Sequence, residues 1–187
     1  MLLKTFFIVK LISKLRYMEN EIINRVANSK LITIDLEDLY IEGTRVVFDI
    51  KDWLYEGLIL KEKDFREKVK SYNWSEHKDQ FVALTCSTDA IIPGWAFMLI
   101  TTAISPYANY TVIGDLELLE TQLYAFEIEK LELSDYKDKP IIIKGCSNKP
   151  VPANAYVTLV QKIQPVVKSI LYGEACSSVP LYKKPKK

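Results

Sequence analysis

The sequence has only one histidine and lacks a glycine-rich phosphate-binding loop, and these two absences remove several common classes of enzyme. With His77 as the single candidate base, no Ser-His-Asp triad can be assigned. Walker-type and dinucleotide-binding motifs are missing as well. Basic and acidic residues balance, 25 against 24, so the net charge of +1 gives no electrostatic reason to expect nucleic-acid binding.

Long apolar runs are also missing, so no membrane-spanning segment is predicted. The segment Met1–Tyr17 is apolar and basic, but lysines interrupt it and it is too short to cross a bilayer. It has no clear small-residue cleavage site of the kind that ends a signal peptide. We expect residues 1–17 to be an extension outside the domain, with a membrane-surface helix as the alternative. Residues 18–187 then form a single domain with a basic C-terminal tail.

Cysteine is scarce too. The chain has three cysteines, an odd number, and no CxxC motif. Both facts argue against a small secreted fold held together by disulfides. We therefore expect a cytoplasmic protein whose thiols are free or bound to a metal.

What the sequence does contain is an internal duplication. Two apolar segments each end in Cys-Ser, and each is preceded by a similar polar lead-in and followed by a Pro-x-x-Ala-aromatic pattern. This order predicts a repeated unit of strand, cysteine turn and helix. One residue must be skipped after the cysteine to keep the alignment. The matched segments are Ser75–Asp79 with Ser134–Asp138, Phe81–Ser87 with Ile141–Ser147, and Pro93–Phe97 with Pro152–Tyr156.

Short apolar runs alternate with helical patterns, which predicts an α/β fold: one domain with a largely parallel sheet covered by helices. Whether Val166–Tyr172 is a strand or continues a helix is left open. The expected strands are Leu31–Leu36, Thr44–Ile50, Phe81–Thr85, Tyr110–Ile113 and Ile141–Lys144, the first two extending the sheet; the expected helices are Glu19–Asn28, Lys61–Tyr72, Pro93–Ile104, Leu116–Leu131 and one beginning at Pro152.

All three cysteines are followed by serine, and two of them directly follow predicted strands. In parallel sheets, ligands gather at the carboxyl ends of the strands. Helix N-termini at that edge favour thiolates, which bind zinc, copper(I) or iron–sulfur clusters. The candidate metal ligands are Cys86, Cys146 and Cys176, with Asp89 and Asp115 as further ligands, and the candidate cofactor is an iron–sulfur cluster or zinc. Inert, buried cysteines are the alternative, and Asp115 also fits a helix N-cap.

His77 is not expected to join this site, because it precedes the strand that Cys86 follows. A five-residue strand separates its two ends by about 16 Å. Cys176 reaches the shared edge only if Val166–Tyr172 is a strand. Otherwise the site needs a returning tail or a second subunit, so a homodimer is one of the alternatives left open.

With these motifs in view, the chain resembles the bacterial family called domain of unknown function 2480. The segments that carry the resemblance are Thr85–Ala90, Gly114–Glu117, Lys144–Cys146 and Tyr172–Ser177. The resemblance implies proteins of the sulfur-mobilisation (SUF) pathway of iron–sulfur assembly as partners. The first hypothesis is therefore an accessory protein in iron–sulfur cluster or metal handling. The alternatives are a thiol enzyme or persulfide carrier using Cys86 or Cys146, and a structural or interaction module, so enzymatic activity is left open.

Overall fold

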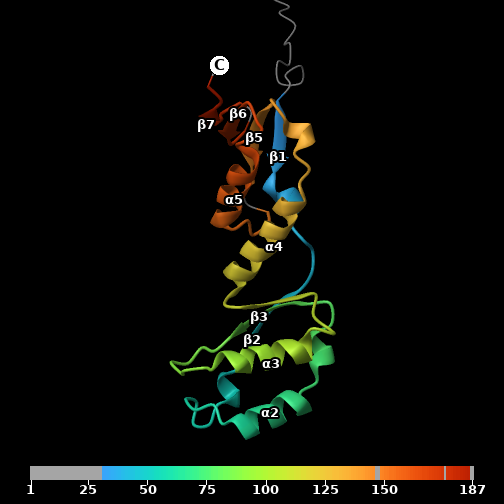
Figure 1. Cartoon of the computed structure of the whole chain (residues 1–187), viewed down its shortest axis with the longest axis vertical. Coiled ribbons are helices and arrows are strands. Elements are labelled where there is room, and N and C mark those ends of the chain that lie inside the picture. The colour runs from blue at the N-terminus through green and yellow to red at the C-terminus, as the bar shows by residue number, and fades with distance from the viewer. Residues whose placement is uncertain (1–30, 146–147, 175, 186–187) are drawn as a thin grey trace, which may run out of the picture. The chain divides into compact units, whose positions relative to one another are not determined.

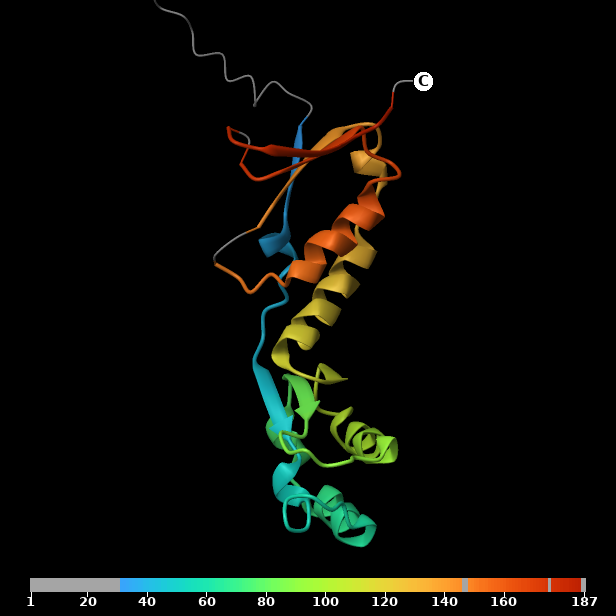
Figure 2. The ribbon, with the colours of Figure 1, turned by 90° about the vertical axis from the view of Figure 1, so that its left-hand side faces the viewer.

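The computed structural model of the chain describes residues 31–145, 148–174 and 176–185 (Figures 1 and 2). The described elements belong to one compact unit, Ile32–Lys187. Its strands are β1 (Ile32–Asp35), β2 (Arg45–Asp49), β3 (Phe81–Thr85), β4 (Tyr110–Ile113), β5 (Pro140–Lys144), β6 (Ser169–Tyr172) and β7 (Val179–Lys183), and its α-helices are α2 (Glu62–Ser71), α3 (Gly94–Ile104), α4 (Leu116–Lys130) and α5 (Ala153–Ile163). Short 3-10 helices are η2 (Leu36–Leu39), η3 (Lys51–Trp53), η4 (Trp74–His77) and η5 (Ser134–Tyr136).

The α/β class and most of the expected elements are confirmed. Within the segment Val166–Tyr172, the last four residues form strand β6 and the first three lead into it, so the segment does not continue the helix. Pro93 and Pro152 lie at the N-cap positions of α3 and α5, one residue before the helical position that we expected for them. The predicted helix Glu19–Asn28 and the extension 1–17 lie outside the described residues, so they stay predictions. In the described part of the chain, no helix combines the length and the apolar character needed to cross a bilayer.

The strands form two sheets, so the expectation of one continuous sheet is wrong. One sheet has the order β1-β5-β6-β7 and the other β2-β3-β4, and every pairing is parallel except that of β7 with β6. The two N-terminal strands cause the difference. β1 pairs with β5, whereas β2 pairs with β3, so each strand starts a separate sheet and neither extends a common one.

The internal duplication is confirmed, and its backbone equivalence is close. Asp79 and Asp138 are both left-handed, with φ of 59° and 55°, and they are 59 residues apart (138 − 79). The backbone N–H of Asp79 donates a hydrogen bond to the carbonyl of Tyr107, shortly before β4. In the other copy, the N–H of Asp138 donates to the carbonyl of Val166, shortly before β6. The same offset converts the bounds of β3, α3 and β4 into those of β5, α5 and β6.

This constant offset corrects the alignment of the cysteines. The N–H of Gly114 donates to the carbonyl of Leu84, and the N–H of Gly173 donates to the carbonyl of Ile143. Both the donor and the acceptor of the second bond lie 59 residues after those of the first. No residue is skipped between strand and helix. The position equivalent to Cys86 is therefore Gly145, and Cys146 is out of register with Cys86 by one residue. The matching Cys-Ser pairs do not mark equivalent positions.

The duplication also includes the first two strands, and one copy is nested within the other. Ile32 pairs with Ile141 in the same way that Val46 pairs with Val82. The inner copy is β2-η3-α2-η4-β3-α3-β4, and the outer copy consists of β1-η2 before it and α4-η5-β5-α5-β6 after it. The chain therefore starts the outer copy, completes the inner one, and returns to finish the outer one.

Helix α4 contributes to the cores of both copies. Leu119 and Leu123 on α4 pack in a cluster with Phe81 and Ala83 of β3. Further along the helix, Tyr124 and Ile128 join the core of the outer copy together with α5, and α4 and α5 lie side by side in both views (Figures 1 and 2). A separate core, rich in aromatic residues, lies between the inner sheet and helices α2 and α3.

Candidate functional site

In each sheet, the N-terminal strand ends in an aspartate whose side chain fixes the turn that follows. Asp35 ends β1 and accepts a hydrogen bond from the backbone N–H of Glu37 at 3.1 Å. Asp49 ends β2 and accepts from Lys51 N–H at 3.0 Å. The repeated pattern Asp-aliphatic-x-Asp, which begins at Asp35 and at Asp49, was the sequence signal for this equivalence. These carboxylates lie at the carboxyl ends of the parallel strands, where ligands bind in such sheets.

Cys86 follows β3 at the carboxyl edge of the inner sheet. Its side chain is partly buried against the aromatic core, and its Sγ lies 3.3 Å from Thr88 Oγ1. Asp49 Oδ1 accepts a hydrogen bond from the next residue, Ser87, at 3.1 Å. Burial alone would raise the pKa of Asp49, but hydrogen bonds from Ser87 and the Lys51 N–H outweigh it and hold that pKa below its ordinary value. The turn that carries Cys86 is thus fixed by a carboxylate that stays ionised at neutral pH.

The carboxyl edge of the outer sheet carries a different set of polar groups. Lys144 ends β5 and forms an ion pair with Asp35 of β1 at 2.9 Å. The hydrogen bond to Asp35 raises the pKa of Lys144, and the negative charge of Glu174 adds to this. Cys176 follows β6 and is exposed. This edge therefore combines a lysine, two carboxylates and an exposed thiol.

Gly145, directly after β5, is fixed by contacts with η2 and α5. Gly145 is buried with φ of 154°, and a Cβ there would lie 3.0 Å from Leu36 Cβ. The Tyr156 hydroxyl of α5 donates to the Gly145 carbonyl. Further along the chain, the Asn148 N–H donates to Glu37 Oε1 at 3.3 Å. Cys146 comes directly after Gly145 in the sequence and lies outside the described residues.

The two-sheet topology removes the argument that all three cysteines meet at one edge. Cys86 follows a strand of the inner sheet, whereas Cys176 follows a strand of the outer sheet. Asp115 is the N-cap of α4, its Oδ1 accepting from Leu118 N–H at 2.8 Å, and Asp89 is exposed in the loop after Cys86. Within residues 31–145, 148–174 and 176–185, no three histidine, cysteine or acidic side chains lie together as a metal site would require.

His77 precedes β3 and Cys86 follows it, so the histidine lies at the other end of this strand from Cys86, as predicted. It belongs to η4, which precedes β3, and it is buried beside Phe48 and Trp74. Its Nε2 lies 3.1 Å from the Tyr72 hydroxyl and its Nδ1 3.0 Å from Gln80 Oε1. These contacts satisfy both ring nitrogens, so the histidine serves the aromatic core.

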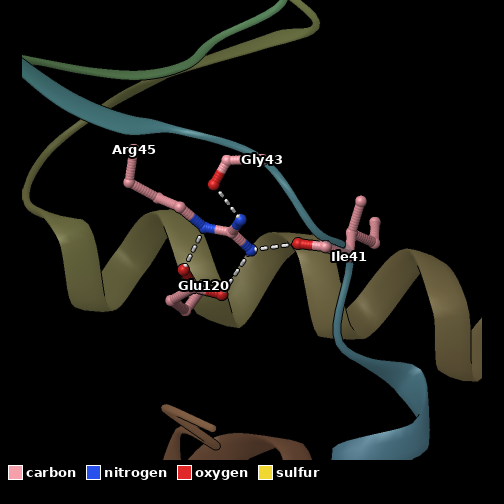
Figure 3. A network of polar contacts seen from close by, with 4 residues as sticks. All are labelled: Ile41, Gly43, Arg45 and Glu120. Carbon is pink, nitrogen blue, oxygen red and sulfur yellow. Dashed lines mark hydrogen bonds and ion pairs between the residues drawn. The ribbon is translucent and has the colours of Figure 1, made fainter.

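A buried ion pair that the sequence did not predict connects the start of β2 to α4 (Figure 3). Arg45 Nε donates to Glu120 Oε1 at 2.6 Å, and the two side chains are only 10% and 9% exposed. The guanidinium also donates to the carbonyls of Gly43 and Ile41 at 2.7 and 2.5 Å. Glu120 lies among the buried, mostly apolar positions of α4. An acidic residue at such a position is the sequence signal that could have indicated a buried ion pair.

The Arg45–Glu120 pair forms part of the wall of a cavity of about 510 Å³. Bonds to Glu120 and to two carbonyls occupy most of the Arg45 donors, so the arginine offers little to an anionic ligand. The cavity lies at the first turns of α4 and α5 and is lined by Tyr40, Arg45, Leu116, Glu117, Glu120, Pro150, Val151, Pro152 and Ala153.

One turn along α4 from Glu120, the Tyr124 hydroxyl is buried and has no hydrogen-bond partner among the described residues. Burial, followed by the charge of Glu120, raises the pKa of Tyr124 to about 12. Replacing Tyr124 with phenylalanine should therefore leave the free energy of unfolding unchanged or raise it by about 1 kcal/mol at pH 8, because it removes an unpaired polar group. This is measured by urea denaturation.

The gain from Tyr124→Phe should grow with alkaline pH. In the wild type, the unfolded chain ionises this tyrosine near its ordinary pKa of 10.0, while the folded chain keeps the proton up to about 12. Wild-type stability is therefore complete below pH 10 and decreases toward pH 12, and the variant lacks this decrease. A variant less stable than wild type at pH 8 would show that the hydroxyl has a partner.

These features define the class of protein: an α/β protein built from two nested copies of one unit, with Cys86 and Cys176 following strands of two small, mostly parallel sheets. A family model described as "Protein of unknown function (DUF2480)" matches residues 20–184. The match covers most of the chain, so the chain belongs to this family. No curated protein and no solved structure matches.

Proposed function

We propose that the protein binds a thiophilic metal ion or an iron–sulfur cluster through Cys146 and Cys176, and acts as an accessory protein in metal or iron–sulfur cluster handling. One observation supports this version over the three-cysteine site. β5 and β6 are adjacent parallel strands, paired at Ile143 and Tyr172, and the two cysteines follow these residues by three and four positions.

The distances along the chain suit a shared site. Adjacent strands are about 4.8 Å apart, and each further residue spans at most about 3.6 Å. Segments of this length allow two thiolates to come within the roughly 4 Å that a single tetrahedral zinc requires. Glu174, two residues before Cys176, is a further ligand of suitable chemistry.

Cys86, Asp89 and Asp115 are outside this proposed site, and this makes the proposal testable with a matched control. We expect near-stoichiometric iron or zinc, measured by elemental analysis, in protein purified without oxygen. Cys146→Ser and Cys176→Ser should each lose most of the metal, whereas Cys86→Ser should keep it. Equal loss in Cys86→Ser would contradict the two-thiolate site. Unchanged metal in a variant lacking all three cysteines would contradict any thiolate site.

The contacts of Cys86 support a second candidate function, that of a thiol enzyme or persulfide carrier. Its sulfur is partly buried, lies 3.3 Å from the Thr88 hydroxyl and precedes α3. The hydroxyl is close enough to donate a hydrogen bond to the sulfur when it reacts as a nucleophile. In that case Cys86 in the folded protein reacts with an alkylating agent faster than a free thiol does at the same pH. Slow alkylation of all three cysteines until the protein unfolds would leave a structural or interaction module.

Partners in the SUF pathway belong to this proposal because the family resemblance implies them. A cluster donor or acceptor would exchange metal at an exposed edge, and Cys176 is exposed. The cytoplasmic location also stays a prediction, which rests on the free thiols.

A further inference from the structure

β4 and β6 are equivalent strands of the two copies, but their outer edges differ. β4 and β6 are related by the constant offset of the two copies. β6 has a neighbour on each side, because β7 pairs with it antiparallel from Ser169–Lys183 to Tyr172–Val179. Within residues 31–145, 148–174 and 176–185, β4 pairs only with β3 and is the last strand in its sheet. After β6 the chain turns back to supply β7, whereas after β4 it enters α4.

We propose that the open edge of β4 binds β4 of a second copy of this chain, in an antiparallel pair across a two-fold axis. The outer copy shows which geometry this edge accepts, since its equivalent edge carries an antiparallel strand. A two-fold axis perpendicular to a sheet makes two identical edge strands antiparallel without any further requirement. The two inner sheets would then join into one continuous sheet.

The chemistry of β4 supports pairing with a copy of itself. Edge strands are normally protected by charges, prolines or bulges. β7 has Pro180 and Lys183, and β2 has Arg45 and Asp49. β4 reads Tyr-Thr-Val-Ile, which carries no charge and no proline and favours the strand conformation. Two copies therefore meet without like-charge repulsion, and a charged peptide would find no complementary charge on the strand itself.

Exposed apolar side chains lie near both ends of β4. Ile113 at the end of β4 is 55% exposed, and Leu118 in the first turn of α4 is 39% exposed. At the other end, Phe126 is 43% exposed and contacts the ring of Tyr110 edge-on at 5.1 Å. A two-fold axis near the middle of β4 would bring the Ile113 end of one copy to the Tyr110 end of the other. Both ends of the contact are thus apolar.

The test uses the full chain and two lysine substitutions at comparably exposed sites on opposite edges of the same sheet. Sedimentation velocity over a range of concentrations, with reductant to prevent disulfides, should show a monomer–dimer equilibrium. Ile113→Lys places an unpaired charge against the apolar Tyr110 end of the partner's strand and should raise the dimer dissociation constant at least about tenfold. Val47→Lys, on β2 and 47% exposed in the wild type, should leave the dissociation constant unchanged.

Hydrogen exchange supplies a second measurement that does not depend on a variant. The amides of β4 should exchange more slowly at concentrations where the dimer is populated, while those of β2 should not change. A wild type that stays monomeric at all concentrations would overturn the proposal. A dimer that Val47→Lys disrupts, or that Ile113→Lys leaves intact, would overturn it as well.

Discussion

Replacing Glu120 with alanine is expected to lower the free energy of unfolding by about 3–5 kcal/mol, because it leaves the buried Arg45 guanidinium without its counter-ion. Arg45 is 10% exposed on its side chain and would keep only the carbonyls of Gly43 and Ile41 as acceptors. Neutral carbonyls do not replace a carboxylate that contacts both Nε and Nη2. Urea denaturation followed by circular dichroism measures the loss.

The chain offers a matched control for this ion pair. Glu62 and Arg66 form an exposed pair on α2 at 2.9 Å, with side chains 63% and 54% exposed. Glu62→Ala should cost at most about 0.5 kcal/mol, because solvent screens that pair. The double variant Arg45→Met/Glu120→Leu should recover most of the stability lost by Glu120→Ala. A loss from Glu120→Ala as small as that from Glu62→Ala would show that Arg45 is solvated.

Replacing Ile128 with alanine is expected to cost about 2–5 kcal/mol and to destabilise both copies together. Ile128 is 1% exposed and packs in the core of the outer copy. The same helix carries Leu119 and Leu123, which pack on the inner sheet. Loss of α4 therefore uncovers apolar surface in both copies, so we expect a single cooperative transition.

The tryptophans make this cooperativity measurable. Trp53, Trp74 and Trp95 all pack in or against the core of the inner copy. Their fluorescence therefore reports the inner copy, whereas far-ultraviolet circular dichroism reports every helix. In Ile128→Ala both signals should shift to the same lower midpoint, while Val157→Ala, at an exposed position of α5, should shift neither. A fluorescence midpoint that stays at the wild-type value would show that the copies unfold independently.

The repeated strands and helices could be predicted from sequence because their signals are local. Apolar runs and turn residues recur at a fixed spacing, and the lead-ins ending at Asp79 and Asp138 share an uncommon left-handed backbone. The cysteines misled the alignment by one residue. A thiol side chain places no demand on backbone register, whereas the Gly114 and Gly173 amides must each reach a strand carbonyl of their own copy. The backbone contacts therefore define the equivalence.

The division into two sheets and the Arg45–Glu120 pair depend on contacts between distant parts of the chain. Within Ile32–Asp35, only Asp35 favours β5 over β3, through its ion pair with Lys144, and a partly exposed pair of this kind is too weak to predict the pairing. Both candidate partners are largely apolar strands of equal length. Similarly, a buried Glu120 indicates that some cation must lie opposite, but the sequence contains 25 lysines and arginines. Tertiary packing selects Arg45 among them. The candidate thiolate pair at β5 and β6 became visible only once those strands were known to be neighbours.

The nesting of the copies has a consequence for the order in which the chain can fold during synthesis. The inner copy is continuous from β2 to β4, so it has all of its strands as soon as β4 is made. β1 is made first, yet its partner β5 follows the whole inner copy. A folded inner copy brings the two halves of the outer copy closer than an unfolded chain of that length would, which lowers the entropic cost of closing the outer sheet. The turns at Gly43 and Gly114, on either side of the inner strands, are accordingly the two points where the inner copy could be removed or exchanged without cutting a strand of the outer one.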